Sequence, residues 1–299
     1  LDSTLALLVC IRAFDAMGID RKGIIGITMP CFGTTKRTLN NSKELMECLG
    51  ITSYEIDITK AVEQHFKDID HDPNKTDITF ENCQARERTQ VLMDMANKHN
   101  AIVIGTGDLS ELALGWATYN GDHMSMYNVN VSIPKTLCIE MVRQSIITGY
   151  SYSAFKSTDE KVRDIISDIC NTPISPELKP VDENGELKQK TENSIGPYEL
   201  HDFFLYHMIR YGFAPNKVFM MAKNSFGKKY SDKEILKWLT TFIKRFFSQQ
   251  FKRSCLPDGP KIGSVSLSPR GDWRMPSDAS RESWFEALTY IPNYNELIN

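Results

Sequence analysis

The sequence predicts an α/β protein in which a parallel sheet is flanked by helices and is followed by a helical carboxyl-terminal extension. Two observations support this prediction. Up to residue 105, short apolar runs typical of buried strands alternate with helix-like segments, which indicates βαβ units with right-handed crossovers. Beyond that point the strict alternation stops, and the remaining periodic segments are helical.

The first part of the chain is expected to contain three strands and four helices. The expected strands lie at residues 23–29, 54–58 and 101–104. The expected helices lie at residues 5–17, 38–50, 59–69 and 81–99. Side chains that cap or end these helices are Asp2, Ser3 and Thr4 before the first, Gly18 after it, and Thr59 before the third.

The second part of the chain is expected to be helical and then irregular. The expected helices lie at residues 137–148, 161–170, 198–211 and 231–247, the last with Ser231 as its cap. Residues 173–196 are rich in Pro, Glu, Lys and Asn, which is typical of a mobile loop or lid. The tail from Gln250 is rich in Gly, Pro and basic residues without periodicity, and we expect it to cover a substrate.

Composition limits the class of protein. The chain has 299 residues, of which 41% are hydrophobic and 24% charged, which suits one large globular domain or a domain with a subdomain. A net charge of −3 and a pI near 6.1 favour neither a nucleic-acid nor a membrane partner. Seven cysteines without metal-ligand spacing, and no signal peptide, predict free thiols in a reducing cytoplasm.

The segment from Ala101 to Gly121 is the first candidate for a binding site. A Gly-Thr-Gly turn follows the expected strand, and Asp108 and Ser110 are placed to cap the next helix. Free N–H groups at the carboxyl edge of a parallel sheet bind anionic ligands. Glu111 has two interpretations: compensation of the helix dipole, or a carboxylate that holds Mg²⁺ beside a phosphate.

The start of the expected helix at 81–99 is a second candidate. Asn82, Arg86 and Arg88 lie outside the apolar stripe of this helix. Two arginines and an amide suit phosphate or ribose binding. Ordinary solvated charge is the alternative, and the residues alone leave both open.

Several stretches, in this order and spacing, resemble the carboxyl-terminal synthetase domain of glutamine-dependent NAD synthetases. The amino-terminal stretch Leu1-Asp2-Ser3-Thr4 resembles the end of the SGGxDS phosphate loop of that family. The other similar stretches are residues 79–89, like the family's ENxQAxxR segment, then 105–122 with 134–136, and in the tail 251–254 and 268–273.

The resemblance implies a Rossmann-like fold of the adenine nucleotide α-hydrolase type. Residues 1–150 would form the ATP pyrophosphatase core, without its first strand and the start of its phosphate loop. Residues 151–299 would form a helical extension and a substrate-covering tail of the same synthetase domain.

The implied reaction is ATP-dependent adenylation of deamido-NAD, followed by amidation with ammonia to give NAD, AMP and pyrophosphate, with Mg²⁺ bound beside ATP. The resemblance also implies an amino-terminal, nitrilase-type glutaminase domain that supplies the ammonia, and assembly into a homo-oligomer. Other ATP pyrophosphatases, such as GMP synthetase, asparagine synthetase or a tRNA-modifying enzyme, and a non-catalytic nucleotide-binding module are the competing classes.

The resemblance also assigns site residues. It implies ATP contacts from Asp2, Ser3, Thr106 and Lys135, and Mg²⁺ ligands in Asp2 and Glu111. The implied deamido-NAD contacts are Asn82, Arg86, Glu111, Trp116, Asp122 and Lys252. Trp116 would stack on the pyridine ring, while Lys252 and Asp2 would be catalytic, Lys252 by offsetting charge on the nicotinate and its forming adenylate.

Each of these positions also has an ordinary interpretation. Asp2 and Ser3 can be helix caps, Lys135 a surface charge and Trp116 a core aromatic. Smaller ammonia-dependent members carry a carboxylate where this chain has Met126, which leaves the deamido-NAD contacts of that loop open.

Overall fold

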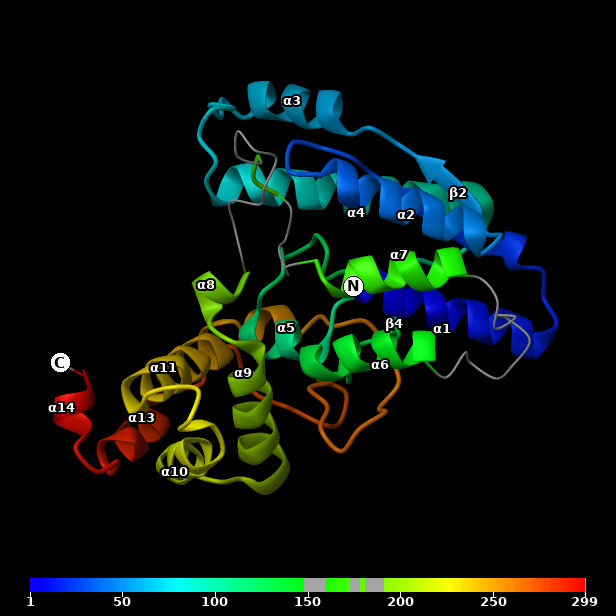
Figure 1. The fold of residues 1–299 in the computed structure, drawn as a ribbon. Helices are drawn as coiled ribbons and strands as arrows, with labels where there is room; N and C mark the ends of the chain where they lie inside the picture. The colour runs from blue at the N-terminus through cyan, green and yellow to red at the C-terminus, as the bar shows by residue number, and fades with distance from the viewer. Residues whose placement is uncertain (148–159, 173–177, 181–190, 299) are drawn as a thin grey trace. The chain divides into compact units, whose positions relative to one another are not determined.

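The computed structural model describes residues 1–147, 160–172, 178–180 and 191–298 (Figure 1). By their internal contacts, the residues fall into two compact units. Unit 1 comprises residues 1–106, 118–129 and 138–190, and unit 2 comprises residues 107–117, 130–137 and 191–299. The predicted boundary at residue 150 and most of the predicted loop at 173–196 lie outside the described residues, so both remain predictions.

Unit 1 contains two pairs of parallel strands, as the α/β prediction requires. In the first pair, β1 (Ile25–Thr28) and β2 (Thr52–Glu55) lie in register from Ile25 opposite Thr52. In the second pair, β3 (Ile104–Gly105) lies beside β4 (Tyr127–Asn128). The parallel arrangement is therefore confirmed.

The strand predicted at 101–104 is shorter than expected. Asn100 adopts the left-handed conformation, and the Ala101 N–H returns to the Ala96 carbonyl at 2.9 Å, so Ala101 belongs to the end of the preceding helix. The strand predicted at 54–58 begins earlier, because the Thr52 N–H donates to the Ile24 carbonyl at 3.0 Å.

The helices of unit 1 lie close to their predicted positions. They are α1 (Asp2–Met17), the short η1 (Arg21–Gly23), α2 (Lys36–Cys48), α3 (Thr59–Asp68), α4 (Ile78–His99), most of α6 (Lys135–Ile147) and α7 (Glu160–Cys170). Gly18 ends α1 with φ 66°, as predicted. Helix α4 begins three residues early, because Asp77 accepts from the Thr79 and Phe80 N–H groups.

Two of the predicted caps are wrong. The residue before α1 is Leu1, which makes no side-chain capping bond, and Asp2 is already the first helical residue, so Asp2, Ser3 and Thr4 lie within the helix and not before it. Thr59 is likewise the first residue of α3, and its N–H donates to Asp57 Oδ1 at 2.8 Å.

The core of unit 1 is aromatic. The rings of Phe32, Phe66 and Phe80 lie with centroids 5.3–6.2 Å apart, against buried Ile58 and Val62. Helices α3 and α4 pack together over this cluster, and α2 packs on α7 (Figure 1). These contacts fix α4, whose start carries Asn82 and Arg86.

Unit 2 is helical and is built around α11 (Asp232–Ser248), which contacts α5, α9, α10, α13 and α14 (Figure 1). The other helices are α5 (Leu109–Leu114), α8 (Thr191–Ile195), α9 (Tyr198–Leu205) with a π-helical turn η2 (Tyr206–Arg210), α10 (Pro215–Phe226), α12 (Gln250–Arg253), α13 (Glu282–Thr289) and α14 (Tyr294–Ile298). Leu239, Phe242, Ile243 and Phe246 form its fully buried face.

Several features of unit 2 were predicted and others were not. The Ser231 cap is confirmed, as a capping box with Glu234. The helix at 198–211 is confirmed, although its second half is π-helical. Helices α8, α10, α12, α13 and α14 were not predicted, and α8 replaces the last part of the loop predicted at 173–196. Apart from α10, these helices are short, and short helices fixed by tertiary packing leave little periodicity in the sequence.

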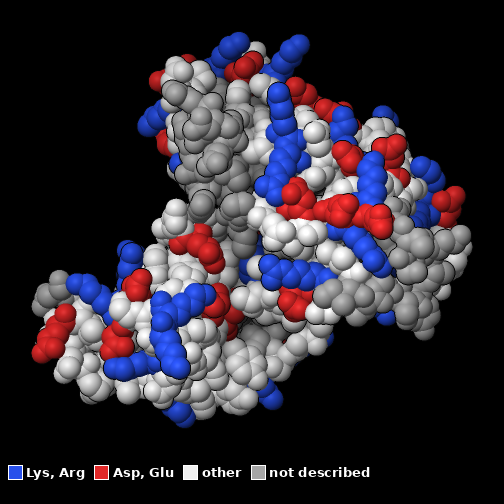
Figure 2. All heavy atoms as spheres, viewed as in Figure 1, with Lys and Arg blue, Asp and Glu red and all other residues white. Residues whose placement is uncertain are grey.

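The described residues contain no helix long and apolar enough to cross a membrane. On the face drawn in Figure 2, basic and acidic side chains are intermixed. None of the seven cysteines forms a disulfide, as predicted.

Candidate functional site

The short helix α5 follows the Gly-Thr-Gly turn and has a fixed amino end. Asp108 is its N-cap: Asp108 Oδ1 accepts from the Glu111 N–H at 2.8 Å, and Glu111 Oε2 accepts from the Asp108 N–H at 3.3 Å. Ser110, the other expected cap, instead accepts from the Lys135 N–H at 2.8 Å. This capping box sets the position of the Glu111 carboxylate.

Lys135 joins this carboxylate pair and is fully buried. Its Nζ lies 2.8 Å from Asp108 Oδ2 and 3.0 Å from Glu111 Oε1. Burying an ammonium requires such partners, so the alternative that Lys135 is an ordinary surface charge is excluded. Glu111 remains 20% exposed, which leaves the cluster accessible at that carboxylate.

Lys252 and Trp116 are brought together within unit 2. Lys252 Nζ donates to the Gly115 carbonyl at 2.8 Å and to the Ala117 carbonyl at 2.6 Å, the residues on either side of Trp116. The indole is half-buried, with the Arg245 guanidinium 5.2 Å from its ring centroid. The predicted catalytic lysine is therefore held against the segment that carries Trp116, the residue predicted to stack on the pyridine ring.

Two arginines fix the carboxyl end of α5. Arg245 Nε donates to the Leu114 carbonyl at 2.8 Å, and an Arg253 terminal nitrogen donates to the Leu112 and Ala113 carbonyls at 3.1 and 3.0 Å. Cations suit these carbonyls because they carry the negative end of the helix dipole. Burial lowers the pKa of Arg253 to about 9.

In unit 1, the segment 118–122 brings together three predicted deamido-NAD residues. Thr118 Oγ1 donates to Asn82 Oδ1 at 2.8 Å, and the Thr118 N–H donates to Asp122 Oδ1 at 2.7 Å. Arg86 Nε donates to the Tyr119 carbonyl at 3.2 Å, while its side chain stays exposed. These contacts fix an amide, a guanidinium and a carboxylate on neighbouring positions.

The remaining predicted ATP contacts are Asp2, Ser3 and Thr106, all in unit 1. Asp2 and Ser3 are in the first turn of α1, and Thr106 directly follows β3. Met126 is exposed, and its N–H donates to the Val103 carbonyl at 3.0 Å, so its backbone helps to attach β4. The proposed roles of these residues in binding ATP or deamido-NAD therefore stay predictions.

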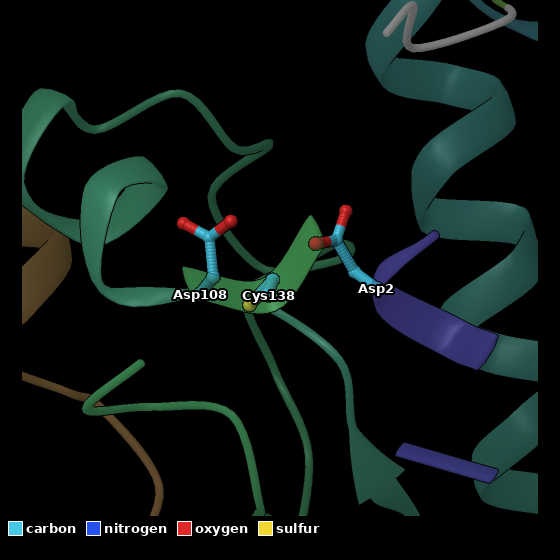
Figure 3. Close-up of side chains that lie close together, drawn as sticks. All are labelled: Asp2, Asp108 and Cys138. Atoms are coloured by element: carbon cyan, nitrogen blue, oxygen red, sulfur yellow. The ribbon is translucent and has the colours of Figure 1, made fainter. Parts of the chain in front are cut away.

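The Asp2 carboxylate lies within 4.8 Å of Cys138 Sγ; Figure 3 draws both, together with Asp108 of unit 2. Mg²⁺ takes oxygen ligands rather than thiols, so the carboxylates of Asp2 and Glu111 fit the ion and Cys138 does not. Asp2 belongs to unit 1 and Glu111 to unit 2. Their joint coordination of one ion stays a prediction.

The sequence missed several contributors to these clusters: the pairing of Asp108 with Lys135, and the roles of Thr118, Asp202, Arg245 and Arg253. Asp108 was interpreted only as a cap. Arg253 lies in a stretch noted for its resemblance, but its burial has no signal in the sequence.

Parallel strands, a Gly-Thr-Gly turn and a capped helix define an α/β protein, a class in which anionic ligands often bind where a strand leads into a helix. Residues 1–148, just under half of the chain, match the model of the NAD synthase family. The resemblance stated from the sequence is therefore confirmed.

Individual relatives agree with this result. The chain is 43% identical over 311 residues to the glutamine-dependent NAD(+) synthetase of Mycobacterium leprae, covering 96% of this chain and 45% of the relative. It is 42% identical to the enzyme of the same name from Mycobacterium tuberculosis, covering 96% and 44%. The chain thus spans less than half the length of these relatives.

A solved structure supports the fold. The glutamine-dependent NAD(+) synthetase from Cytophaga hutchinsonii superposes with a TM-score of 0.68 at 19% identity, covering 91% of this chain and 40% of that one. At this identity the likeness shows the fold alone, and it agrees with the predicted α/β core and helical carboxyl-terminal region.

Proposed function

We propose that this chain is the synthetase part of a glutamine-dependent NAD synthetase, which adenylates deamido-NAD with ATP and then amidates it with ammonia. The observation that carries the proposal is the 43% identity, over 96% of the chain, to a relative of that name. The products would be NAD, AMP and pyrophosphate.

The chemistry has two steps. A carboxylate is a poor acceptor for an amine because its leaving group would be oxide. An oxygen of the nicotinate carboxylate therefore attacks the α-phosphorus of ATP, and pyrophosphate leaves. Ammonia then attacks the activated acyl carbon, the bond to AMP breaks, and the attacking nitrogen loses a proton to give the amide.

The charged part of this reaction suits four side chains: Glu111, Lys135 and Lys252 of unit 2 and Asp2 of unit 1. Glu111 with Asp2 would hold Mg²⁺, which would neutralise charge on the departing pyrophosphate. Lys135 would contact an ATP phosphate with the same ammonium that now pairs with Asp108 and Glu111. Lys252, held beside Trp116, would offset charge on the nicotinate and its adenylate while the indole stacks on the pyridine.

The unit 1 cluster suits recognition of the dinucleotide. Asn82, Arg86 and Asp122 offer an amide, a guanidinium and a carboxylate, which match the phosphate and hydroxyl groups of deamido-NAD. Ser3 and Thr106 would add ATP contacts beside Asp2.

We assign glutamine hydrolysis to a nitrilase-type glutaminase domain outside this chain, which would supply ammonia to the site. This assignment is supported by the relatives, of which more than half the length lies outside the part that this chain matches. Assembly into a homo-oligomer in the cytoplasm completes the proposal.

An activity assay of the full-length protein tests this function. With ATP, Mg²⁺ and ammonium, we expect AMP release to require deamido-NAD and to equal the NAD formed. AMP release that requires another acceptor, such as the substrate of GMP synthetase, would reject the proposal. Binding of ATP without any AMP release would favour a non-catalytic nucleotide-binding module.

A further inference from the structure

Asp202 in α9 is a half-buried carboxylate to which the proposed function gives no role. Its Oδ1 accepts from the Ser110 hydroxyl of α5. Its Oδ2 accepts from the Thr136 N–H at 3.0 Å and from Thr136 Oγ1 at 2.7 Å, at the start of α6. One carboxylate thus binds three donors from the first turns of two other helices, all within unit 2.

The Ser110 hydroxyl extends this contact to Lys135. Ser110 Oγ accepts from the Lys135 N–H at 2.8 Å and donates its single hydrogen to Asp202. Because the carboxylate only accepts, it orients the hydroxyl so that a lone pair faces Lys135. The first N–H groups of a helix have no partner within the helix, so Asp202 and Ser110 together cap α6.

Resting on the function proposed above, we propose that Asp202 is a positioning residue for the ATP and Mg²⁺ part of the site. It holds the first turn of α6 against the first turn of α5. These two turns carry Lys135 and Glu111, whose charged groups lie 3.0 Å apart. Loss of Asp202 releases the start of α6 and misplaces the Lys135 ammonium relative to Glu111.

A carboxylate suits this position better than an amide does. An asparagine offers one acceptor oxygen, and its NH₂ group would face a donor at the second position. With its oxygen toward Thr136, its NH₂ can donate to Ser110, which must then turn its own hydrogen elsewhere. Asp202→Asn therefore keeps the shape and part of the bonding, whereas Asp202→Ala removes all three acceptor contacts.

Steady-state kinetics of Asp202→Asn and Asp202→Ala test the proposal, with Glu199→Gln as the control. Glu199 lies on the same helix, and its carboxylate accepts from Lys229 and Tyr230 of the α10–α11 connection instead. Varying ATP with Mg²⁺, we expect kcat/KM to fall about 10- to 100-fold in Asp202→Ala, as for lost supporting partners of a site. In Asp202→Asn we expect kcat/KM for ATP to fall about fivefold, which corresponds to the loss of one hydrogen bond.

The KM for deamido-NAD should stay within about twofold of the wild-type value in both Asp202 variants. A change of about twofold is smaller than the effect of losing one hydrogen bond. Two results would overturn the proposal. One is a fall in kcat/KM for ATP in Asp202→Ala that is no larger than the fall in Glu199→Gln. The other is an equal loss for ATP and deamido-NAD, because a merely structural role would damage both. Should the alanine variant not fold, the asparagine variant decides by the same criteria.

Amide hydrogen exchange separates this proposal from the proposed reaction. In Asp202→Ala, peptides that contain the Lys135 and Thr136 amides should exchange faster than in the wild type, whereas Glu199→Gln should leave them unchanged. Unchanged exchange in Asp202→Ala would contradict the positioning role. A wild-type protein without synthetase activity would instead reject the proposed function, with the exchange result still valid.

Discussion

Thr118 bonds two residues that we assign to deamido-NAD, Asn82 through its hydroxyl and Asp122 through its N–H. Thr118→Val keeps the shape of the side chain but removes the donor to Asn82 Oδ1. We expect the KM for deamido-NAD to rise about fivefold, the equivalent of one hydrogen bond, with little change in kcat. Thr118→Ser, which keeps the hydroxyl, is the control in the same kinetic titration. A valine variant indistinguishable from the serine variant would remove Thr118 from this role.

Lys252 tests the charge proposed over the nicotinate. We expect Lys252→Ala to lower kcat about 100-fold, as when one donor to a developing charge is lost. The Kd for ATP, measured by equilibrium titration, should change much less. Lys244→Ala, an exposed lysine of α11, is the control. A normal kcat in Lys252→Ala would take this lysine out of the reaction.

At the scale of residues, sequence identified Glu111 and Lys135 as candidates but not their contact. Their side chains meet only because α5 and α6 start side by side, 24 positions apart in the chain. Asp108 was predicted as a cap, which it is, yet its second oxygen pairs with Lys135. Local capping follows from spacing, whereas ion pairs between helices depend on tertiary packing.

The end of α5 depends on a glycine that can be tested against a matched position. Gly115 and Gly18 both end helices with positive φ, 59° and 66°. A Cβ at Gly115 would lie 2.2 Å from Gln249 Cβ, whereas one at Gly18 meets nothing within 4 Å. We expect Gly18→Ala to cost about 1 kcal/mol of unfolding free energy, and Gly115→Ala clearly more.

Gly115→Ala should also lower turnover, because the Gly115 carbonyl holds Lys252. Denaturant unfolding and the NAD synthesis assay measure the two effects. Equal stability losses at the two glycines, with normal turnover in both, would contradict this account of α5.

Helix α9 carries a histidine that should make folding sensitive to pH. His201 is 1% exposed, Nε2 donates to the Ile195 carbonyl at 2.7 Å, and Nδ1 has no hydrogen-bond partner among the described residues. Burial lowers its pKa from 6.5 to about 4. Between these values the unfolded chain binds the proton and the folded protein does not, so stability falls as the pH drops from about 6.5 to about 4.

His201→Gln keeps a donor for the Ile195 carbonyl and does not titrate. The wild type should lose about 3 kcal/mol more than this variant across that window. Asp202, whose pKa burial raises, contributes with the opposite sign but is present in both proteins. Denaturant midpoints at several pH values give the difference, and parallel curves would contradict a neutral buried His201.

At the scale of elements, helices with strong end signals were predicted best. Gly18 and the Ser231–Glu234 pair fix their helix ends through local bonds that sequence spacing encodes. Strand limits were predicted less well, because β3 is only as long as its partner β4. Helices α13 and α14 pack on α11, and no local sequence pattern predicts this packing.

At the scale of the whole molecule, the proposed function places NAD synthesis and glutamine hydrolysis at separate sites linked only by ammonia. In the longest form that the gene encodes, a glutamine analogue that alkylates the amidase nucleophile should stop glutamine-dependent NAD formation. Ammonium-dependent NAD formation should continue, because the site proposed here uses free ammonia. Loss of both activities would contradict a separable synthetase site.

The division of this molecule into two units could not be predicted from a linear sequence pattern. The chain passes between the units more than once, so residues close in sequence, such as Thr106 and Asp108, belong to different units. The family resemblance supplied the candidate residues from the order of motifs in the sequence, and the roles of these residues stay predictions.

Transfer of an oxygen isotope from deamido-NAD to AMP tests the proposed adenylation step. Deamido-NAD labelled with ¹⁸O in its carboxylate is converted with unlabelled ATP and ammonium, and the AMP is analysed by mass spectrometry. Adenylation at the α-phosphorus predicts one labelled oxygen in each AMP formed. Unlabelled AMP, or label in phosphate or pyrophosphate instead, would contradict it.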